Sequence, residues 1–122
     1  MRTIVAGCRD IFSTKEFKNA RIVAKTHGIY IDTLVCGMAK GVDTMAYEWA
    51  KRVGIEVHKY PADWSLGKSA GYIRNAEMAD NADALIAVWD GYSKGTKMMI
   101  DLATKKGLKV YVHRVERNCD EV

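Results

Sequence analysis

The sequence predicts an α/β protein with three layers, in which a parallel sheet of about five strands carries helices on both faces. Three observations predict this class. Short apolar runs alternate with segments that have apolar residues at helical spacing. The helical segments run for about 11 to 15 residues, a length that suits right-handed crossovers between parallel strands. One run, ALIAVW at 84–89, is apolar throughout, as expected of a strand buried on both faces of a sheet.

The first half of the chain contains two strand–helix units. Residues 3–7 form a short apolar strand, and S-T-K-E at 13–16 is a capping box that starts a helix stopping at Gly28. Residues 31–36 form the second strand. The second helix is predicted by apolar residues at helical spacing, which are Val42, Met45, Ala46, Trp49, Ala50 and Val53.

The second half repeats the alternation. Residues 55–60 form the third strand, and a less hydrophobic helix follows over 68–81. After the run at 84–89, a helix over 95–106 precedes the fifth strand at 108–113. Strand and helix therefore alternate to the end of the predicted fold.

Length and composition predict one soluble domain. The 122 residues suffice for one core and are too few for two, and 48% of them are hydrophobic and 28% charged. We expect this domain to span 1–113 and a polar tail to follow at 114–122. No run approaches the roughly 18 apolar residues of a membrane span, so no membrane partner is expected. The start, MRTIVAG, lacks a signal-peptide apolar region, which predicts a cytoplasmic protein.

The cysteines and charges narrow the kinds of ligand. Three cysteines without a CxxC pair, and without a Cys/His cluster at ligand spacing, predict neither a disulfide framework nor a metal site. No cofactor is expected. The net charge of +4 suits an anionic ligand and does not by itself imply nucleic acid.

Glycines, cations, hydroxyls and acids gather after four of the predicted strands. The segments are GCRD at 7–10, GMAKGVD at 37–43, PADW at 61–64 and DGYSKGT at 90–96. The carboxyl ends of parallel strands meet at one edge of the sheet, where such folds bind their ligands. The opposite edge carries mainly helix stops, so the sequence predicts a site at the first edge.

Two glycine-bearing loops at this edge predict phosphate binding. Residues 37–41 and 91–96 each precede a helix, whose free N–H groups and dipole attract anions. Neither loop matches the P-loop or the G-x-G-x-x-G pattern, which disfavours nucleoside triphosphatases and classical dinucleotide enzymes. If the first loop cradles a phosphate, Gly41→Val should abolish binding and leave the fold largely intact.

The segments GCRD, CGMAKGVDTMAYEWA, YPADW, GYIRNAEM and YSKGT resemble, in order and spacing, the SLOG superfamily of Rossmann-like domains. The resemblance is strongest to its small YspA/YpsA-like, DUF2493-type branch and covers residues 3 to 112. Cys8 stands where the family pattern has serine, and Met38 where it has a second glycine. The superfamily includes LOG phosphoribohydrolases, the DNA-processing protein DprA and sensors of nucleotide second messengers. The resemblance thus implies a Rossmann-like fold and a phosphate-bearing, nucleotide-like ligand.

The edge segments and the resemblance together predict the ligand-binding residues. These are Gly7, Cys8, Arg9, Gly37, Met38, Lys40, Gly41, Asp43, Trp64, Arg74, Asn75, Asp90, Gly91, Ser93, Gly95 and Thr96. Some have an alternative role. Asp43 could stabilise only the first turn of its helix, Arg74 could pair with Glu77, and Trp64 could anchor its own loop.

Catalytic residues are harder to identify. LOG enzymes carry P-G-G-x-G-T-x-x-E, and the resemblance places Met99 where their catalytic Glu stands. Asp90 and Asp43 are the acids best placed for general acid–base work, with Arg74 as a third candidate. The departure at Met99 favours binding over catalysis.

Three functions compete. The first is capture of a nucleotide or nucleotide-derived signal, of cyclic or ADP-ribose type, by a sensor or sponge that a host or a phage could encode. The second is LOG-like hydrolysis of an N-glycosidic or phosphate bond. The third, DprA-like binding of single-stranded DNA, is weakest because the charge is modest. We also expect a homo-oligomer, with Trp49, Met45 and Met98 supplying apolar surface.

Overall fold

The sheet has five parallel strands in the order β3-β2-β1-β4-β5. The computed structural model describes residues 1–10 and 13–116. The strands are β1 (Arg2–Gly7), β2 (Thr33–Cys36), β3 (Glu56–Lys59), β4 (Ala84–Trp89) and β5 (Lys109–Arg114). β1 lies at the centre, and β4 is buried along almost its whole length between β1 and β5. This confirms the predicted parallel sheet.

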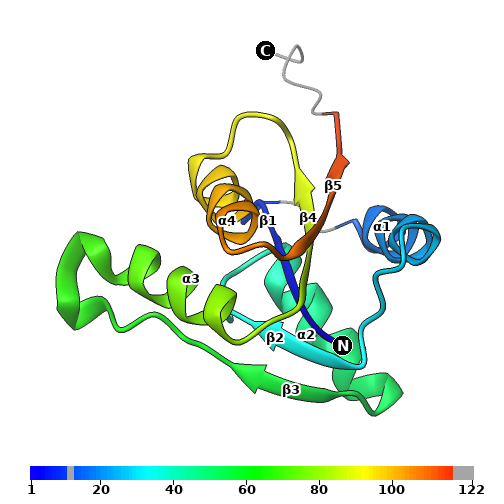
Figure 1. The fold of residues 1–122 in the computed structure, drawn as a ribbon, viewed down its shortest axis with the longest axis horizontal. Helices are drawn as coiled ribbons and strands as arrows, with labels where there is room; N and C mark the ends of the chain where they lie inside the picture. The colour runs from blue at the N-terminus through cyan, green and yellow to red at the C-terminus, as the bar shows by residue number, and fades with distance from the viewer. Residues whose placement is uncertain (11–12, 117–122) are drawn as a thin grey trace.

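The helices lie in two layers, one on each face of the sheet (Figure 1). They are α1 (Thr14–Thr26), α2 (Val42–Val53), α3 (Ala70–Asp80) and α4 (Lys94–Lys105), with a 3-10 helix, η1 (Trp64–Ser69), before α3. The Ser13 side chain accepts a hydrogen bond from the Glu16 amide at 3.2 Å. The predicted capping box therefore does start α1.

Each face of the sheet has its own hydrophobic core, because successive strand residues point to opposite faces. Val5, Ile86 and Val88 pack with the buried alanines and Phe17 of α1 and α2. Ile4 and Leu85 pack on the other face with Met78, Met99, Leu102 and other residues of α3 and α4. The α/β class and its three layers are thus as the sequence predicts.

The chain changes its direction of winding between β1 and β4. Strands β2 and β3 are added on one side of β1, whereas β4 and β5 are added on the other. The loops that leave β1 and β4 therefore diverge to opposite faces and open a crevice at the carboxyl edge. Register places Gly7 at the end of β1 beside Val88 of β4, directly below that crevice.

Several element boundaries differ from the predicted ones. β2 and β3 are shorter than the predicted strands at 31–36 and 55–60. The 3-10 helix has no counterpart among the predicted elements; Asp63 caps its start, and the Asp63 carboxylate accepts the Ser65 amide at 3.1 Å. β5 runs to Arg114 and Val115 is buried, so ordered packing continues past residue 113. The predicted tail otherwise lies outside the described residues.

The apolar residues expected to join two copies have partners within one chain. Trp49 makes an edge-to-face contact with Phe17 and lies beneath the Arg21 guanidinium. Met45 packs against the core on the same face. Association between copies stays a prediction. Within residues 1–10 and 13–116, no helix is long and apolar enough to cross a membrane.

Candidate functional site

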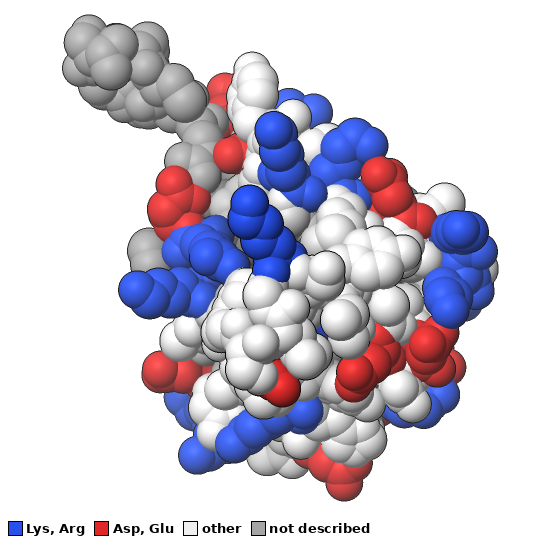
Figure 2. All heavy atoms as spheres, turned by 90° about the vertical axis from the view of Figure 1, so that its left-hand side faces the viewer, with Lys and Arg blue, Asp and Glu red and all other residues white. Residues whose placement is uncertain are grey.

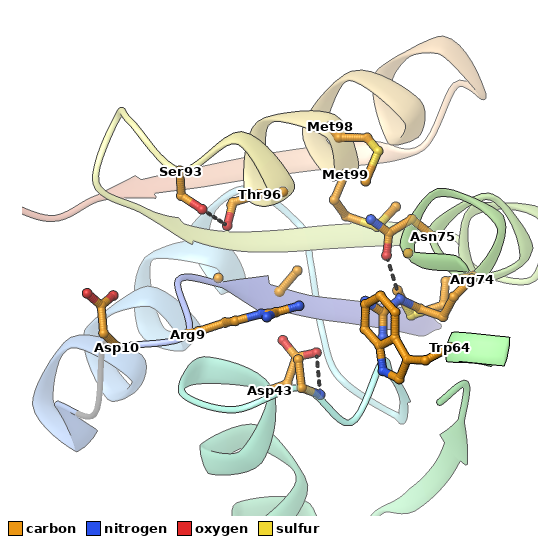
Figure 3. Close-up of a pocket in the computed structure, with 16 residues that line it drawn as sticks. Arg9, Asp10, Asp43, Trp64, Arg74, Asn75, Ser93, Thr96, Met98 and Met99 are labelled. Carbon is orange, nitrogen blue, oxygen red and sulfur yellow. Dashed lines mark hydrogen bonds between the residues drawn. The ribbon is translucent and has the colours of Figure 1, made fainter. Parts of the chain in front are cut away.

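A cavity of about 540 Å³ opens at the carboxyl edge of the sheet, in the crevice between the loops that leave β1 and β4 (Figure 3). Four segments build it: the β1–α1 loop, the β2–α2 loop, η1 with α3, and the start of α4. Its lining consists of Ala6, Gly7, Arg9, Asp10, Ala39, Asp43, Trp64, Gly71, Arg74, Asn75, Met78, Ser93, Gly95, Thr96, Met98 and Met99.

The end of β1 brings Arg9 into this cavity. A Cβ added at Gly7 would lie 2.6 Å from both the Val88 carbonyl oxygen and the Val42 Cγ2 atom. Only glycine lets α2 and β4 approach the strand this closely. The chain then passes through buried Cys8 and turns outward, and the exposed Arg9 side chain extends into the cavity between Asp43 and Thr96 in Figure 3.

Two backbone amides of the β2–α2 loop bond to side chains at the two ends of the same loop. The Asp43 carboxylate accepts the Ala39 amide at 3.2 Å, and the Met38 amide lies 3.4 Å from the Cys36 sulfur. Amides used in this way are not available to a phosphate. Two amides of the loop are therefore used within it, and phosphate binding by residues 37–41 stays a prediction.

Gly41 fills a packing role in this loop. It has φ of +80°, and a Cβ added there would lie 2.5 Å from the carbonyl carbon and oxygen of Arg9. It lies against the backbone of the β1–α1 loop and is absent from the cavity lining. The expectation that Gly41→Val leaves the fold intact is therefore corrected, because the added side chain would displace backbone.

Asp43 is the buried acid of the site. Its side chain is 6% exposed, and burial raises its pKa from 3.8 to about 6. The Ala39 amide and the positive charges of Arg74 and Arg9 oppose this shift by favouring the carboxylate. Asp43 thus holds a proton more tightly than a free aspartate and gains or loses it near neutral pH.

Arg74 of α3 connects two of the segments that build the site. Arg74 Nη1 donates to the Gly37 carbonyl oxygen at 2.6 Å, and its Nε donates to the Asn75 Oδ1 atom at 2.8 Å. Asn75 is buried and lines the cavity. The pairing with Glu77 that the sequence allowed is not the observed one. Arg74 both joins α3 to the β2–α2 loop and presents positive charge to the cavity.

The β4–α4 loop leaves the start of its helix open. Asp90 Oδ1 accepts the amides of Tyr92 and Ser93 at 2.8 and 2.9 Å, which shapes the loop. Ser93 precedes α4 without capping it through its side chain. The first amides of a helix have no acceptor within the helix. Gly95 and Thr96, in the first turn of α4, line the cavity.

A second, smaller cavity of about 320 Å³ adjoins the first. Arg9, Ala39, Trp64 and Arg74 line both cavities, and we call these four residues the shared wall. The smaller cavity is otherwise lined by Gly37, Met38, Lys40, Pro61 and Ala62. Trp64 is 60% exposed, so its indole stands at the surface of the wall instead of anchoring its loop in a core.

Comparison with known proteins places the chain in a family. The sequence model of YAcAr, the YspA, cpYpsA-related SLOG family, matches residues 1–67, more than half of the chain. The protein belongs to this SLOG family. The matched residues include the β1–α1 and β2–α2 loops and PADW; the residues of α3 and the β4–α4 loop lie beyond them.

A solved structure shows the same fold. The chain is similar to the X-ray structure of DNA processing protein A (DprA) from Streptococcus pneumoniae, with a TM-score of 0.69 and 17% sequence identity. The likeness covers 91% of this chain and 49% of the DprA chain, so the protein spans about half the length of that relative. None of the curated proteins matches the sequence.

The SLOG domain brings most of the predicted ligand-binding residues to one place. Those that line one or both cavities are Gly7, Arg9, Gly37, Met38, Lys40, Asp43, Trp64, Arg74, Asn75, Ser93, Gly95 and Thr96. Four line neither cavity: Cys8, Gly41 and Asp90, which are buried, and Gly91, which is half-buried. A Cβ at Gly91 would meet the Arg114 guanidinium, so this glycine makes room for β5.

The SLOG cavity also has lining residues that were not among the predicted ligand-binding residues. Asp10 lies in the GCRD segment and Gly71 in the GYIRNAEM segment, but neither was named as a ligand contact. Met98 and Met99 were expected in the core or at an interface, yet both line the cavity, and Met99 is nearly fully buried. Among the described residues, no group of three or more His, Cys, Asp or Glu side chains could hold a metal ion.

Proposed function

We propose that this SLOG protein binds a phosphate-bearing, nucleotide-like molecule in the larger cavity and acts by capturing it. One observation carries the proposal: two guanidinium groups, from Arg9 and Arg74, face the same cavity as the uncapped first turn of α4. Arginine forks and helix N-termini are the two protein groups best suited to phosphate oxygens. Their convergence at the point where the strand order reverses supports a nucleotide site.

Arg9 and Arg74 place two positive charges beside Asp43. Both guanidinium groups favour the Asp43 carboxylate, and the pKa of Arg74 is lowered chiefly by burial, with a smaller contribution from Arg9. Asp43 and Asp10 also line the cavity, so its lining carries charges of both signs. A phosphate bound between the two guanidinium groups would lessen their mutual repulsion, which is the physical reason to expect affinity.

Trp64 supplies a surface for a base. An indole that is 60% exposed beside two arginines leaves an apolar face uncovered in the free protein. Stacking of a base on an aromatic face contributes about 1 to 3 kcal/mol and tolerates any base. The site thus has features for a phosphate and for a base, and nothing in it selects one base.

Hydrolysis of the ligand is the second candidate. Asp10 and Asp43 line the cavity, and the pKa of Asp43, about 6, suits a general acid–base group. Against this stands Met99, which the resemblance to LOG enzymes aligns with their catalytic Glu; a thioether has no proton to give. We therefore place capture ahead of turnover.

Binding of single-stranded DNA is the third candidate. It is favoured by the exposed Trp64 and by the likeness of fold to a DNA processing protein. Single-strand binders carry a basic groove that tracks the backbone. On the face seen in Figure 2, Lys and Arg side chains are separated by uncharged and acidic ones instead of forming an unbroken groove. A small ligand fits this surface better.

Calorimetric titration with the four nucleoside monophosphates, ADP-ribose and a thymidine oligonucleotide tests the proposal. We expect binding of at least one nucleotide, a loss of tenfold or more in Arg9→Gln, and no change in Arg52→Gln, a matched control on the exposed end of α2. Chromatography of each mixture would detect turnover. Binding unaffected by Arg9→Gln contradicts the proposed site. New product peaks favour the hydrolase, and tighter binding of the oligonucleotide favours DNA.

A further inference from the structure

A third cavity lies at the opposite edge of the sheet, where the strands begin. Its volume is about 260 Å³, and it lies between α1 and α2. Residues 29–32, which directly precede β2, and Ile55, which directly precedes β3, belong to its lining and place it at the amino edge (Figure 1). None of its lining residues lines either cavity of the carboxyl edge. It is therefore a separate pocket.

Most of the lining of this amino-edge cavity is apolar. Ile29 and Ile86 are buried, whereas Ile31 and Ile55 are partly buried and pack against the same core. Trp49 of α2 supplies an aromatic wall. A cavity of about 150 Å³ with aliphatic and aromatic walls is large enough for benzene. The amino-edge cavity therefore has room for an apolar body of that size and for one small polar group.

Arg21 places a positive charge within this apolar lining. Its guanidinium carbon lies 4.8 Å from the centre of the Phe17 ring and 4.2 Å from that of the Trp49 ring, so two aromatic faces hold the group in position. The Arg21 Nε atom is buried and has no hydrogen-bond partner among the described residues. No ion pair within residues 1–10 and 13–116 involves Arg21. A buried donor without a partner is rare in native proteins and points to a missing acceptor.

The charges around the amino-edge cavity favour an anion. Lys25, on the same helix as Arg21, adds a second cation to the lining. The pKa of Arg21 is lowered chiefly by burial and also by the charge of Arg52, so a third cation lies nearby. The acid in the lining, Asp32, already accepts a hydrogen bond from the N-terminal ammonium at 2.8 Å. A negative group would therefore meet a guanidinium that is partly stripped of water and lacks a counter-charge.

We propose that the amino-edge cavity is a second binding site, which takes a small monocarboxylate with an apolar body about the size of one aromatic ring. Its carboxylate pairs with Arg21, and its body fills the space between the isoleucines and Trp49. A carboxylate matches the planar guanidinium in shape and carries a single charge. Phosphate has no apolar part and would lose more hydration in this lining than one guanidinium returns. The inference goes beyond the proposed function and does not depend on it.

Calorimetric titration of the full chain with benzoate and benzamide tests this site. Benzamide has the ring and the size of benzoate and lacks its charge. In the wild type we expect benzoate to bind at least tenfold more tightly than benzamide, and an excess of AMP or inorganic phosphate to leave benzoate affinity unchanged. Arg21→Gln should lower benzoate affinity at least tenfold. Lys18→Gln is the matched control and should stay within twofold of the wild type, because Lys18 is an exposed cation of α1 outside the lining.

Ile31→Phe, which fills the cavity and keeps Arg21, should lower benzoate affinity at least tenfold. If Arg21→Gln loses its circular dichroism spectrum, Ile31→Phe decides: a loss of affinity supports the site, and unchanged affinity overturns it. Absence of benzoate binding to the wild type overturns the inference, as does equal affinity for benzoate and benzamide. Displacement of benzoate by AMP would place it at the carboxyl edge and overturns the inference too, while leaving the proposed function standing.

Discussion

The β2–α2 and β4–α4 loops look equivalent in sequence and differ in the structure. The segments 37–41 and 91–96 each contain two glycines and a lysine at the same edge of the sheet, but Lys94 and Gly95 of the second already belong to the first turn of α4. In the first, Asp43 accepts an amide of its own loop and Gly41 packs against the Arg9 backbone. In the second, Gly95 has nothing within 4 Å of an added Cβ and lies at the cavity. Gly41 thus allows one segment to pack against the chain, whereas Gly95 leaves space at the cavity.

The difference teaches that a glycine pattern has two physical meanings. A glycine can make room for a ligand, or it can make room for another part of the same chain. Both roles require the absence of a side chain, so the local sequence does not distinguish between them. The predictions below test this distinction, and the largest effects come from the loop that is packed.

Gly41→Ala should cause the largest loss of stability. Strain at a positive φ costs about 1 to 2 kcal/mol, and overpacking against the Arg9 backbone adds about 1 to 3 kcal/mol. Gly67→Ala is the matched control, because Gly67 has φ of +78° and ψ of −150°, near the +80° and −123° of Gly41, and nothing within 4 Å of an added Cβ. Chemical denaturation of both variants measures the difference. Equal losses would mean that Gly41 does not pack as described.

Asp43 should make stability depend on pH. Because its folded pKa of about 6 lies above 3.8, protonation favours the folded state. The contribution, about 3 kcal/mol at most, is fully present below pH 3.8 and is lost as pH rises through 6. Denaturation of the wild type between pH 4 and 7.5 should show this slope in comparison with Asp43→Asn.

The control for that comparison is Asp101→Asn, which alters an exposed carboxylate paired with Lys97 and should keep the wild-type slope. Parallel curves for the wild type and Asp43→Asn would show that the buried carboxyl does not titrate in this range. Asp43→Asn is also expected to be more stable than the wild type above pH 6, because a neutral amide costs less to bury than a carboxylate.

Gly95→Val should separate binding from stability in the open loop. A Cβ added at Gly95 has nothing within 4 Å in the free protein, so we expect stability to change by less than about 1 kcal/mol. Nucleotide affinity, in contrast, should fall at least tenfold, because the side chain stands at the first turn of α4. Denaturation and calorimetry on the same preparation test both parts. A destabilised variant, or one with unchanged affinity, would remove the contrast with Gly41.

Asp90→Asn should have the smallest effect. Its carboxylate shapes the open loop by accepting two amides, and the amide oxygen of asparagine can accept the same bonds. We expect a loss of about 1 kcal/mol in stability and an affinity within threefold of the wild type. Asp90 was a candidate acid, and abolition of any measured turnover by this substitution would restore it to that role.

The sequence by itself determined the order of the elements. Periodicity, the Ser13 cap and the glycine stops are local signals, and the helices and strands they predict are present with small shifts at their ends. The unbroken apolar run at 84–89 predicted a buried strand, and β4 has those bounds. Parallel topology then required the strand ends to meet at one edge, which is why most predicted site residues line the cavities.

Only the tertiary structure decided what each of those residues does. Gly41 faces the Arg9 backbone, and Arg74 reaches the Gly37 carbonyl oxygen, 37 positions away in the chain. Met98 and Met99 line the cavity because α4 crosses beside α3, a relation that no helical pattern contains. The division into two cavities is likewise made by side chains from four separate segments. Such contacts join distant parts of the chain, so no local sequence signal predicts any one of them.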